Sequence, residues 1–383
     1  MRKSIGIRHG WVRGALGAIV AFVGASNAWA DDNVNSAKAV YALTNEATGN
    51  RLAVFARDGR GMLTPAGFVP TGGLGTGENT QNQGGLAFSD DRRFIYAVNP
   101  GDNTITVFSV TRRGPVPVQQ IESGGQLPNS LAVRDNLLYV LNAGSVAGGV
   151  DNIAGFRIGR RGALSPIPNS SRPLSAPATG AAQVAFSRDG NVLIVTERLT
   201  NRITTFTLDK SGVAGTPQPM TSAGATPFGF KVNRDGFLII SDAAGGANGL
   251  SAASSYAVND HGTLSVISGS VPTLQTAACW VAVTENGRYA YTGNAGSGTI
   301  TGFAVGGQGT LTRIDGNGGT VTTGGAAAAP TEMAILENRV LYVLNRGSGG
   351  IGVFWIQNDG TLVPMQNLEG VLPETFGDGL LAN

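Results

Sequence analysis

The sequence has little of the chemistry that most metal and redox sites require. Only one Cys and two His occur among its 383 residues. A single Cys cannot form a disulfide within the chain, and so few Cys and His residues cannot complete a zinc module. We therefore expect neither a disulfide scaffold nor a zinc module. We assign no metal-binding residues and no cofactor, while a cation held by carboxylates and carbonyl oxygens stays open, because such ligands leave no spacing signal.

Charge is also scarce, because only 14% of the residues are charged, with 27 Lys and Arg against 25 Asp and Glu. Disordered chains combine strong net charge with few hydrophobic residues, and a 42% hydrophobic fraction excludes that class here. A formal net charge of +2 argues against a nucleic-acid partner. By contrast, the 58 glycines and the many β-branched residues predict an all-β protein with many turns.

Residues 1–30 have the pattern of a secretory signal peptide. A basic start precedes an apolar run at 15–25 that is shorter than a membrane span of ~20 residues. Ala28-Trp29-Ala30 then places small residues where a signal peptidase cleaves. We predict cleavage after Ala30 and a periplasmic or secreted protein without a membrane span, a retained N-terminal anchor being the alternative. Cleavage would leave 23 basic against 25 acidic residues, and His261 as the one histidine.

Short strand patterns recur along the remainder of the chain. The first kind, of the form GLAF or SLAV, starts about every 45 to 53 residues, which is the period of propeller blades; it occurs at 85–88, 130–133, 183–186, 229–232, 280–283, 332–335 and 379–382. The second kind, of the form IYAVN or LYVLN, occurs at 41–45, 95–99, 138–142, 193–197, 238–242, 290–294 and 341–345.

Two further strands complete each repeat. The third carries an aromatic residue: Phe55, Phe108, Phe156, Phe206, Tyr256, Phe303 or Phe354. The fourth begins after Gly, as in Gly262-Thr263-Leu264. Four short strands per repeat predict a seven-bladed β-propeller with four-stranded antiparallel blades, forming a single domain over 31–383 that we expect to be a monomer. Because the first repeat lacks its own first strand, we expect the C-terminal strand to join the N-terminal blade and close the ring.

These motifs resemble a known family. The YVLN and IYAVN strands, the GRYAYTGNAGSGTITGF segment at 287–303 and the Gly-Thr-Leu strand starts are similar to the seven-bladed lactonase-like propellers. That family includes 6-phosphogluconolactonases and carboxymuconate-lactonising enzymes, and surface propellers with YVTN repeats share much of the pattern. The resemblance covers nearly all of the chain after the signal peptide.

The resemblance implies a site of a His, acidic residues and arginines on one face. The stretch where a His is expected reads TGAAQ at 179–183, without histidine, and the glutamate expected after Asn294 is replaced by Ala295. The arginine that opens a third strand is matched by Arg202. Whether the protein is an enzyme at all therefore stays open.

The last residue of the second strand provides an independent indication of a site. It is an asparagine in five blades: Asn45, Asn99, Asn142, Asn294 and Asn345. Asparagine often serves turns by bonding nearby backbone, but the fourth and fifth blades have Glu197 and Asp242 there. With Arg202, these acids are our catalytic candidates, a carboxylate orienting water and a guanidinium stabilising an oxyanion. Arg198, Trp280 and the asparagines other than Asn45 are candidates for binding a small molecule.

Other residues receive structural interpretations. Cys279 lacks a nearby activating base, because we expect His261 on the opposite face, and we assign the thiol to packing. Trp280 could stack on a ring or pack within its strand, and Trp355 is assigned to blade packing. The Gly-rich segments 72–84 and 143–152 are expected to be face loops.

Two hypotheses for function remain. The first is an exported lactonase or lactonising cycloisomerase acting on a small acidic lactone, with Glu197 or Asp242 as the base. The second is a non-catalytic envelope propeller that binds a glycan, a protein or a small molecule.

Overall fold

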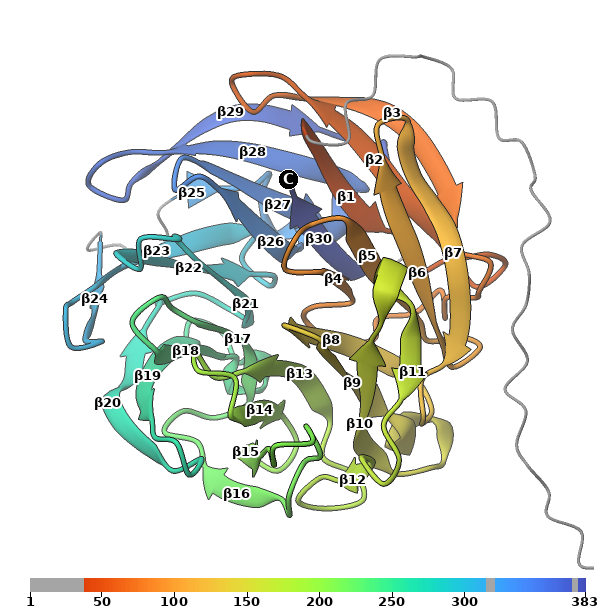
Figure 1. The fold of residues 1–383 in the computed structure, drawn as a ribbon. Coiled ribbons are helices and arrows are strands. Elements are labelled where there is room, and N and C mark those ends of the chain that lie inside the picture. The colour runs from red at the N-terminus through yellow and green to blue at the C-terminus, as the bar shows by residue number, and fades with distance from the viewer. Residues whose placement is uncertain (1–37, 315–320, 374–377) are drawn as a thin grey trace, which may run out of the picture.

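A computed structural model describes residues 38–314, 321–373 and 378–383, and within these ranges the strands form seven antiparallel sheets arranged around one axis (Figure 1). The predicted all-β seven-bladed propeller is confirmed. The signal peptide assigned to residues 1–30 lies outside the described residues. None of the helices in the described ranges has the length and apolar character needed to cross a bilayer.

The first three blades contain the N-terminal strands. Blade 1 consists of β1 (Ala39–Leu43), β2 (Arg51–Arg57), β3 (Leu63–Pro70) and β30 (Asp378–Ala382). Blade 2 consists of β4 (Leu86–Phe88), β5 (Phe94–Asn99), β6 (Thr104–Thr111) and β7 (Gly114–Glu122). Blade 3 consists of β8 (Pro128–Arg134), β9 (Leu137–Ala143), β10 (Asp151–Ile158), β11 (Leu164–Pro166) and β12 (Arg172–Pro173).

The remaining blades follow in chain order. Blade 4 consists of β13 (Ala181–Phe186), β14 (Val192–Glu197), β15 (Arg202–Thr207) and β16 (Gln218–Thr221), and blade 5 of β17 (Pro227–Val232), β18 (Phe237–Asp242), β19 (Ala252–Val258) and β20 (Leu264–Pro272). Blade 6 consists of β21 (Ala278–Val283), β22 (Tyr289–Asn294), β23 (Thr299–Val305), β24 (Leu311–Arg313) and β25 (Val321–Thr322), and blade 7 of β26 (Pro330–Leu336), β27 (Val340–Asn345), β28 (Gly350–Ile356) and β29 (Leu362–Leu368).

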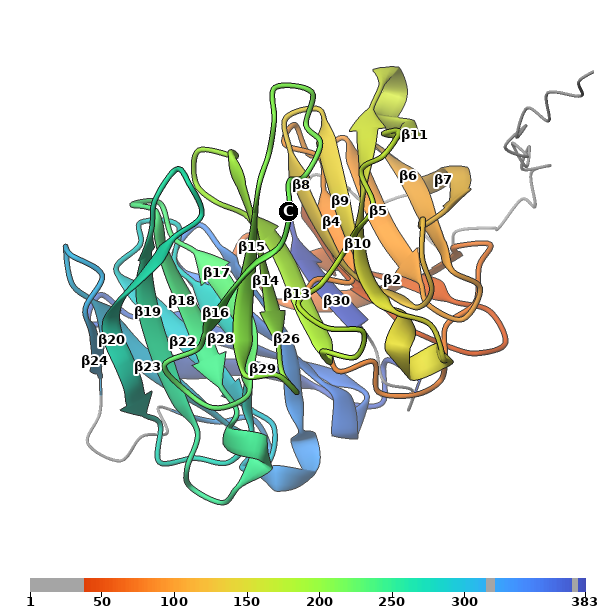
Figure 2. The ribbon, with the colours of Figure 1, turned by 90° about the horizontal axis from the view of Figure 1, so that it is seen from below.

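Short 3-10 helices occur in the connections: η2 (Gly144–Ala147), η3 (Arg160–Gly162), η4 (Ala244–Gly246), η5 (Ala326–Ala328) and η6 (Arg346–Ser348). The strands run between two faces of the disc, as the view across the ring shows (Figure 2). We call one face the loop face: it carries the loops between second and third strands and the connections from each fourth strand to the next blade. The opposite face, with the hairpin turns, is the turn face.

The C-terminal strand closes the ring as predicted. β30 pairs antiparallel with β1, with Ala382 opposite Val40 and Leu380 opposite Ala42. The backbone N–H of Asn383 also donates to the Ala39 carbonyl at 2.9 Å. Blade 1 is therefore assembled from both ends of the folded chain, and its inner strand hides a sheet edge that would otherwise be unpaired.

Buried tyrosines fasten neighbouring blades to each other. The Tyr342 hydroxyl in β27 donates to the Gly61 carbonyl in blade 1 at 3.0 Å, and the Tyr291 hydroxyl in β22 donates to the Gly360 carbonyl in blade 7 at 2.8 Å. Each accepting glycine sits in a turn with φ of +90° or +84°, which side chains rarely adopt. Part of the glycine excess therefore serves the turns that receive these bonds.

Some details differ from the sequence predictions. The second strand of blade 1 ends at Leu43 rather than at Asn45, because Asn45 has a left-handed φ of 55°. The fourth strand is divided in blades 3 and 6, where β12 and β25 pair separately with the third strands. Trp355 is not enclosed by blade packing, since 36% of its surface is exposed.

Candidate functional site

The residue predicted to end each second strand is buried in all seven blades. All seven are at most 1% exposed: Asn45, Asn99, Asn142, Glu197, Asp242, Asn294 and Asn345. Asn99 donates through its amide to the hydroxyls of Thr104 and Thr106, at 3.0 and 2.9 Å. Asn294 bonds Thr299 and Thr301 in the same way. At these positions the side chain ties the end of the second strand to the third strand.

Asn142 and Asn345 occupy the same position with fewer bonds. Asn345 donates to the Thr323 carbonyl at 3.2 Å, and its Oδ1 has no hydrogen bond. Both polar atoms of Asn142 are buried without a hydrogen-bond partner. A Cβ added at Gly125 would lie 2.6 Å from the Asn142 side chain, so the asparagine faces this connection at close range.

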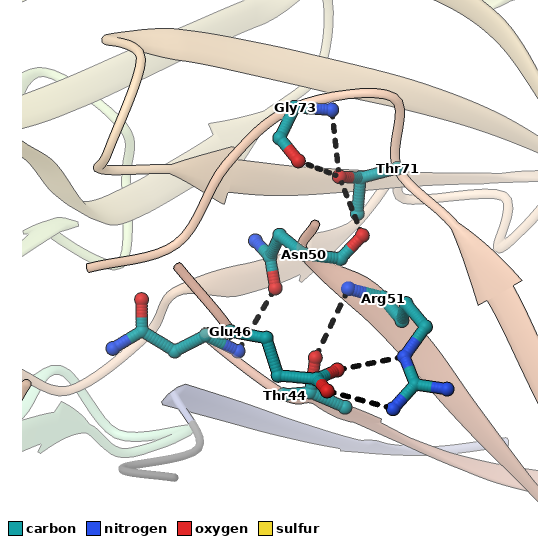
Figure 3. Close-up of polar contacts among 7 residues, drawn as sticks. Thr44, Glu46, Asn50, Arg51, Thr71 and Gly73 are labelled. Carbon is teal, nitrogen blue, oxygen red and sulfur yellow. Dashed lines mark hydrogen bonds and ion pairs between the residues drawn. The ribbon is translucent and has the colours of Figure 1, made fainter. Parts of the chain in front are cut away.

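Figure 3 shows the polar contacts around Asn50 and Arg51 in blade 1. The Asn45 backbone N–H donates to the Asn50 side chain at 2.9 Å. The Arg51 guanidinium forms two bonds to Glu46, at 2.7 and 2.8 Å. The Thr71 hydroxyl donates to the Asn50 carbonyl at 3.0 Å. Glu46 is therefore neutralised by an arginine of its own blade.

Glu197 is fully buried and both of its carboxylate oxygens accept hydrogen bonds. Oε1 accepts from the Thr204 hydroxyl at 2.6 Å and from the Ser175 backbone N–H at 3.1 Å. Oε2 accepts from the Thr200 hydroxyl at 2.7 Å and from the Ser175 hydroxyl. These four bonds fix the connection that contains Ser175 and the loop that begins at Arg198.

Asp242 is equally buried but less well bonded. Its Oδ2 accepts from the Ser254 hydroxyl at 2.5 Å, whereas its Oδ1 is buried without a partner. A Cβ added at Gly224 would lie 2.1 Å from the Asp242 carboxyl carbon. Burial raises the pKa of Asp242 to about 7, because a carboxylate in this setting loses the solvation that stabilises its charge. The Ser254 bond lowers the pKa but offsets only part of this effect.

Arg202 lies on the exposed first position of β15, directly opposite Glu197 in the strand pairing. Asp242 belongs to the next blade and faces the connection containing Gly224, whereas Glu197 faces the one containing Ser175. Arg202 and Glu197 are therefore paired across the neighbouring strands β15 and β14. The structure places the two acids at separate seams between blades.

The residue that follows the second strand is an arginine in two blades. In blade 4 this residue is Arg198 and in blade 7 it is Arg346, each beginning the loop after the second strand. Both guanidinium groups act electrostatically on Cys279. The sequence analysis identified Arg198 but missed Arg346, although comparing the residues at this repeat position would have found both.

Arg198 is surrounded by aromatic and polar groups. Its guanidinium carbon lies 5.3 Å from the centroid of the Phe228 ring, and that ring lies 5.2 Å from the ring of Trp280. One terminal nitrogen is 3.4 Å from the Gln81 side-chain oxygen, while its buried Nε has no hydrogen-bond partner. Burial lowers the pKa of Arg198, and the nearby Cys279 and Asp151 counteract this.

Cys279 lies in the wall of this cluster. Burial raises the pKa of its thiol to about 12, although Arg198 and Arg346 act in the opposite direction. The thiol is therefore protonated at neutral pH and a poor nucleophile. His261 lies in the exposed turn between β19 and β20, on the turn face, where the sequence analysis expected it.

The connection from β3 to β4 crosses the channel mouth. The Gln83 side chain donates to the Val281 carbonyl at 2.7 Å and accepts from the Val281 N–H at 3.0 Å, as a neighbouring strand would. The Gln83 backbone N–H donates to the Ala182 carbonyl at 3.1 Å. The Trp280 indole donates to the Asn82 carbonyl at 2.7 Å. This segment, residues 80–84, links blades 4 and 6 across the axis, and we call it the plug.

At the loop face, Arg198, Phe228, Trp280 and Arg346 form a cationic and aromatic cluster around Cys279, in which both aromatic rings are buried. The guanidinium groups of such a cluster can bind a small anion. Across the described ranges, no group of three or more His, Cys, Asp and Glu side chains is arranged to hold a metal ion. Trp280 is 4% exposed and contributes to the packing of the cluster.

Comparisons with known proteins agree with the fold. The sequence matches the family described as "Lactonase, 7-bladed beta-propeller" over residues 34–172 and 151–246, which together span more than half of the chain. No curated protein matches the chain in sequence.

Solved structures extend the likeness to almost the whole chain. A periplasmic gluconolactonase from Pseudomonas aeruginosa is 18% identical, with a TM-score of 0.67 over 89% of this chain and 98% of that one. A candidate 6-phosphogluconolactonase from Bacteroides fragilis is 18% identical, with a TM-score of 0.66 over 90% and 98%. A hypothetical selenium-binding protein from Sulfolobus tokodaii is 12% identical, with a TM-score of 0.66 over 90% and 93%.

At these identities the solved structures establish the architecture, and their different names show that one architecture serves different functions. The membership rests on the sequence match together with the observed blades. The chain belongs to the seven-bladed β-propeller lactonase family.

Proposed function

We propose that the protein is an exported lactonase-type propeller that binds a small acidic lactone at the loop face and hydrolyses or forms its ring. The observation that carries this proposal is the Arg198 guanidinium, whose buried Nε has no hydrogen-bond partner and whose carbon lies 5.3 Å from the Phe228 ring. A buried donor without a partner is costly, so an acceptor supplied by a ligand would be favourable there.

The charge balance of the mouth supports an anionic ligand. Arg198 and Arg346 both act electrostatically on Cys279. Asp151, which acts on Arg198, already accepts from Ser145 and Thr179. Glu332 accepts from the Gly84 N–H of the plug, and burial raises the pKa of Glu332 to about 7. The local field therefore favours a carboxylate or a developing oxyanion.

In the proposed hydrolysis, water adds to the lactone carbonyl carbon, and the bond from that carbon to the ring oxygen breaks. The proton lost by water reaches the departing alkoxide, which becomes a hydroxyl group. An arginine at the mouth would stabilise the oxyanion formed on the way. The same steps in reverse form the lactone from the hydroxy acid and release water.

The candidates from the sequence take different parts in this proposal. Asp242 is the candidate base, because its Oδ1 has no hydrogen-bond partner and burial raises its pKa to about 7, which suits proton transfer near neutral pH. Glu197 is a positioning residue that fixes the loop beginning at Arg198. Arg202, which is exposed nearby, would attract the anion, and Trp280 would form part of the apolar wall.

The asparagines at the ends of the second strands act through the loops in this proposal. Asn99 and Asn294 would keep the loop after each second strand in place through their threonine bonds. Asn142 and Asn345, which have unbonded polar atoms, are the members that could still accept a ligand group.

The test is a panel of acidic and neutral lactones with purified wild type, R198A, E197Q and D242N. R113A is the matched control, because Arg113 is an exposed arginine in the turn between β6 and β7. We expect R198A to lose at least tenfold in kcat/KM for acidic lactones and little for neutral ones, with R113A unchanged. Equal turnover by wild type and R198A would refute the assignment of Arg198.

The same panel separates catalysis from binding alone. The four hydrogen bonds that occupy the Glu197 carboxylate favour the alternative of a non-catalytic propeller. If wild type binds an acidic lactone, R198A does not, and neither protein turns over any lactone, this alternative would be established.

Export is part of the proposal, and its support is the basic and apolar pattern of residues 1–30. The mass and N-terminal sequence of the protein recovered from a periplasmic fraction test it. We expect a mature chain that starts at Asp31. An intact chain confined to the cytoplasm would refute export.

A further inference from the structure

A second groove with ligand-binding chemistry lies on the turn face, between blades 6 and 7. It has a volume of about 310 Å³, which lies at the small end of the range of ligand pockets. Its aromatic walls are Tyr289 and Trp355, and polar side chains surround them. The groove is separate from the loop-face cluster, because its lining comes from the hairpin turns.

Trp355 departs from the repeat at its position. The residue after the third-strand aromatic is small, polar or charged in the other six blades: Ala56, Ser109, Arg157, Thr207, Ala257 and Ala304. Trp355 is 36% exposed although its blade has a complete core without it. The propeller fold therefore does not require the exposed indole of Trp355, because one blade alone has a Trp at this position.

Two arginines are held against the aromatic rings of this groove. The Arg339 guanidinium carbon lies 6.0 Å from the centroid of Trp355, and that of Arg288 lies 5.6 Å from the centroid of Tyr289. Such stacking fixes the direction of each guanidinium while its N–H groups stay free to donate. The Tyr289 hydroxyl donates to the Asn358 carbonyl at 2.7 Å, which fixes the ring and closes one end of the groove.

Several polar groups of the groove retain hydrogen-bonding capacity. In the described part of the chain, no hydrogen bond engages the side chains of Glu337, Gln357 or Arg288. Asn338 accepts from the Asn286 N–H at 2.7 Å through its oxygen, which leaves its amide N–H groups available. Donors and acceptors therefore surround an aromatic surface.

The comparable groove between blades 4 and 5 has a different lining. It has a volume of about 340 Å³ and contains Phe237 at the repeat position of Tyr289, but Ala257 at the position of Trp355, and its polar lining includes Asp189, Asp235 and Asp260. A groove with one aromatic side chain is thus a product of the fold, whereas the second aromatic side chain, Trp355, distinguishes the groove between blades 6 and 7 from the one between blades 4 and 5.

We propose that the groove between blades 6 and 7 binds a pyranose ring of a saccharide. The C–H groups of a pyranose face pack well on an aromatic ring, whose face carries negative charge. Its hydroxyls both donate and accept, which matches Glu337 and Gln357 as acceptors and Arg288 and Arg339 as donors. The site lies on the face opposite the proposed lactone site and would hold the protein on a glycan while the loop face stays open.

The test measures binding of a neutral and an acidic disaccharide, cellobiose and digalacturonate, by calorimetry with the mature protein. The variants are W355A and Q357A, and the matched control is V363A. Val363 is 41% exposed and lies opposite Trp355 on β29, outside the groove lining, so its truncation removes exposed apolar surface of the same strand pair.

We expect at least one disaccharide to bind, with affinity at least tenfold weaker for W355A, severalfold weaker for Q357A and unchanged for V363A. Binding of cellobiose alone identifies a neutral sugar, and binding of digalacturonate alone shows that the arginines recognise a carboxylate. Absence of binding by wild type, or equal binding by W355A in a chain with wild-type circular dichroism, would overturn the proposal.

Discussion

The Asp242 carboxyl group provides a quantitative link between burial and stability. It is 1% exposed, one oxygen has no partner, and burial raises its pKa to about 7 from the usual 3.8. The informative change is D242N, which keeps the shape of the side chain and an oxygen for the Ser254 hydroxyl. It removes the ionisation.

The sign of the effect follows from the raised pKa. The folded protein holds the Asp242 proton more tightly than the unfolded chain, so rising pH favours unfolding. The penalty begins above the unfolded pKa, grows through the range from about 4 to about 7, and is complete above the folded pKa. At 1.36 kcal/mol per pKa unit, the difference between a pKa of 3.8 and one of about 7 corresponds to about 4 kcal/mol of unfolding free energy lost by wild type at alkaline pH.

The measurement is urea unfolding of wild type and D242N at intervals from pH 5 to pH 9. The difference between the two proteins isolates Asp242 from other groups, including Glu332, whose pKa burial also raises to about 7. We expect the free energy of unfolding of D242N, relative to that of wild type, to rise by about 2 to 3 kcal/mol between pH 5 and pH 7. Above pH 7 this difference between the two proteins should stay nearly constant. A difference that does not change with pH would refute the buried-carboxyl argument.

Three further changes test the packing. Y342F removes the hydroxyl that bonds the Gly61 carbonyl across the closing seam, and leaving that carbonyl unsatisfied should cost about 1–3 kcal/mol in urea unfolding, whereas Y289F at an exposed hydroxyl should cost about 0.5 kcal/mol or less. Q83L deprives both Val281 backbone groups of partners, so we expect a lower unfolding temperature and faster amide exchange at Val281, and unchanged exchange would contradict the plug. G229A places a Cβ 2.0 Å from the Gln83 oxygen and 2.7 Å from the Cys279 carbonyl, so a thermal melt should show strong destabilisation; a wild-type melt would mean that the plug can withdraw at little cost.

Much of the fold can be predicted because its strands repeat. The inner strands and the aromatic third strands each recur with a similar short sequence from blade to blade. The first repeat lacks its own first strand, and this predicts the pairing of β30 with β1. Strand limits are less accurate where a single residue leaves the pattern. Asn45 adopts a left-handed conformation, which shortens its strand, and neither Asn45 nor the following Glu46 predicts this conformation.

The loop face is harder to predict because its contacts join residues far apart in the chain. Gln83 and Val281 are 198 positions apart, and nothing in the Gly- and Asn-rich segment around Gln83 indicates which blade it meets. Likewise, the bonds of Glu197 depend on Ser175, which lies outside every repeated strand. The repeat does reveal the position shared by Arg198 and Arg346, but only when the blades are compared one residue beyond the strand.

The pairing of β30 with β1 also determines when the molecule can become complete. During synthesis, six blades can form from contiguous chain, but blade 1 has to wait with three strands and an open inner edge. Residues 378–382 follow the strands of all the other blades, so they emerge after those strands have left the ribosome. Blade 1 is therefore the last blade to be completed, and its three N-terminal strands keep an unpaired inner edge until β30 arrives.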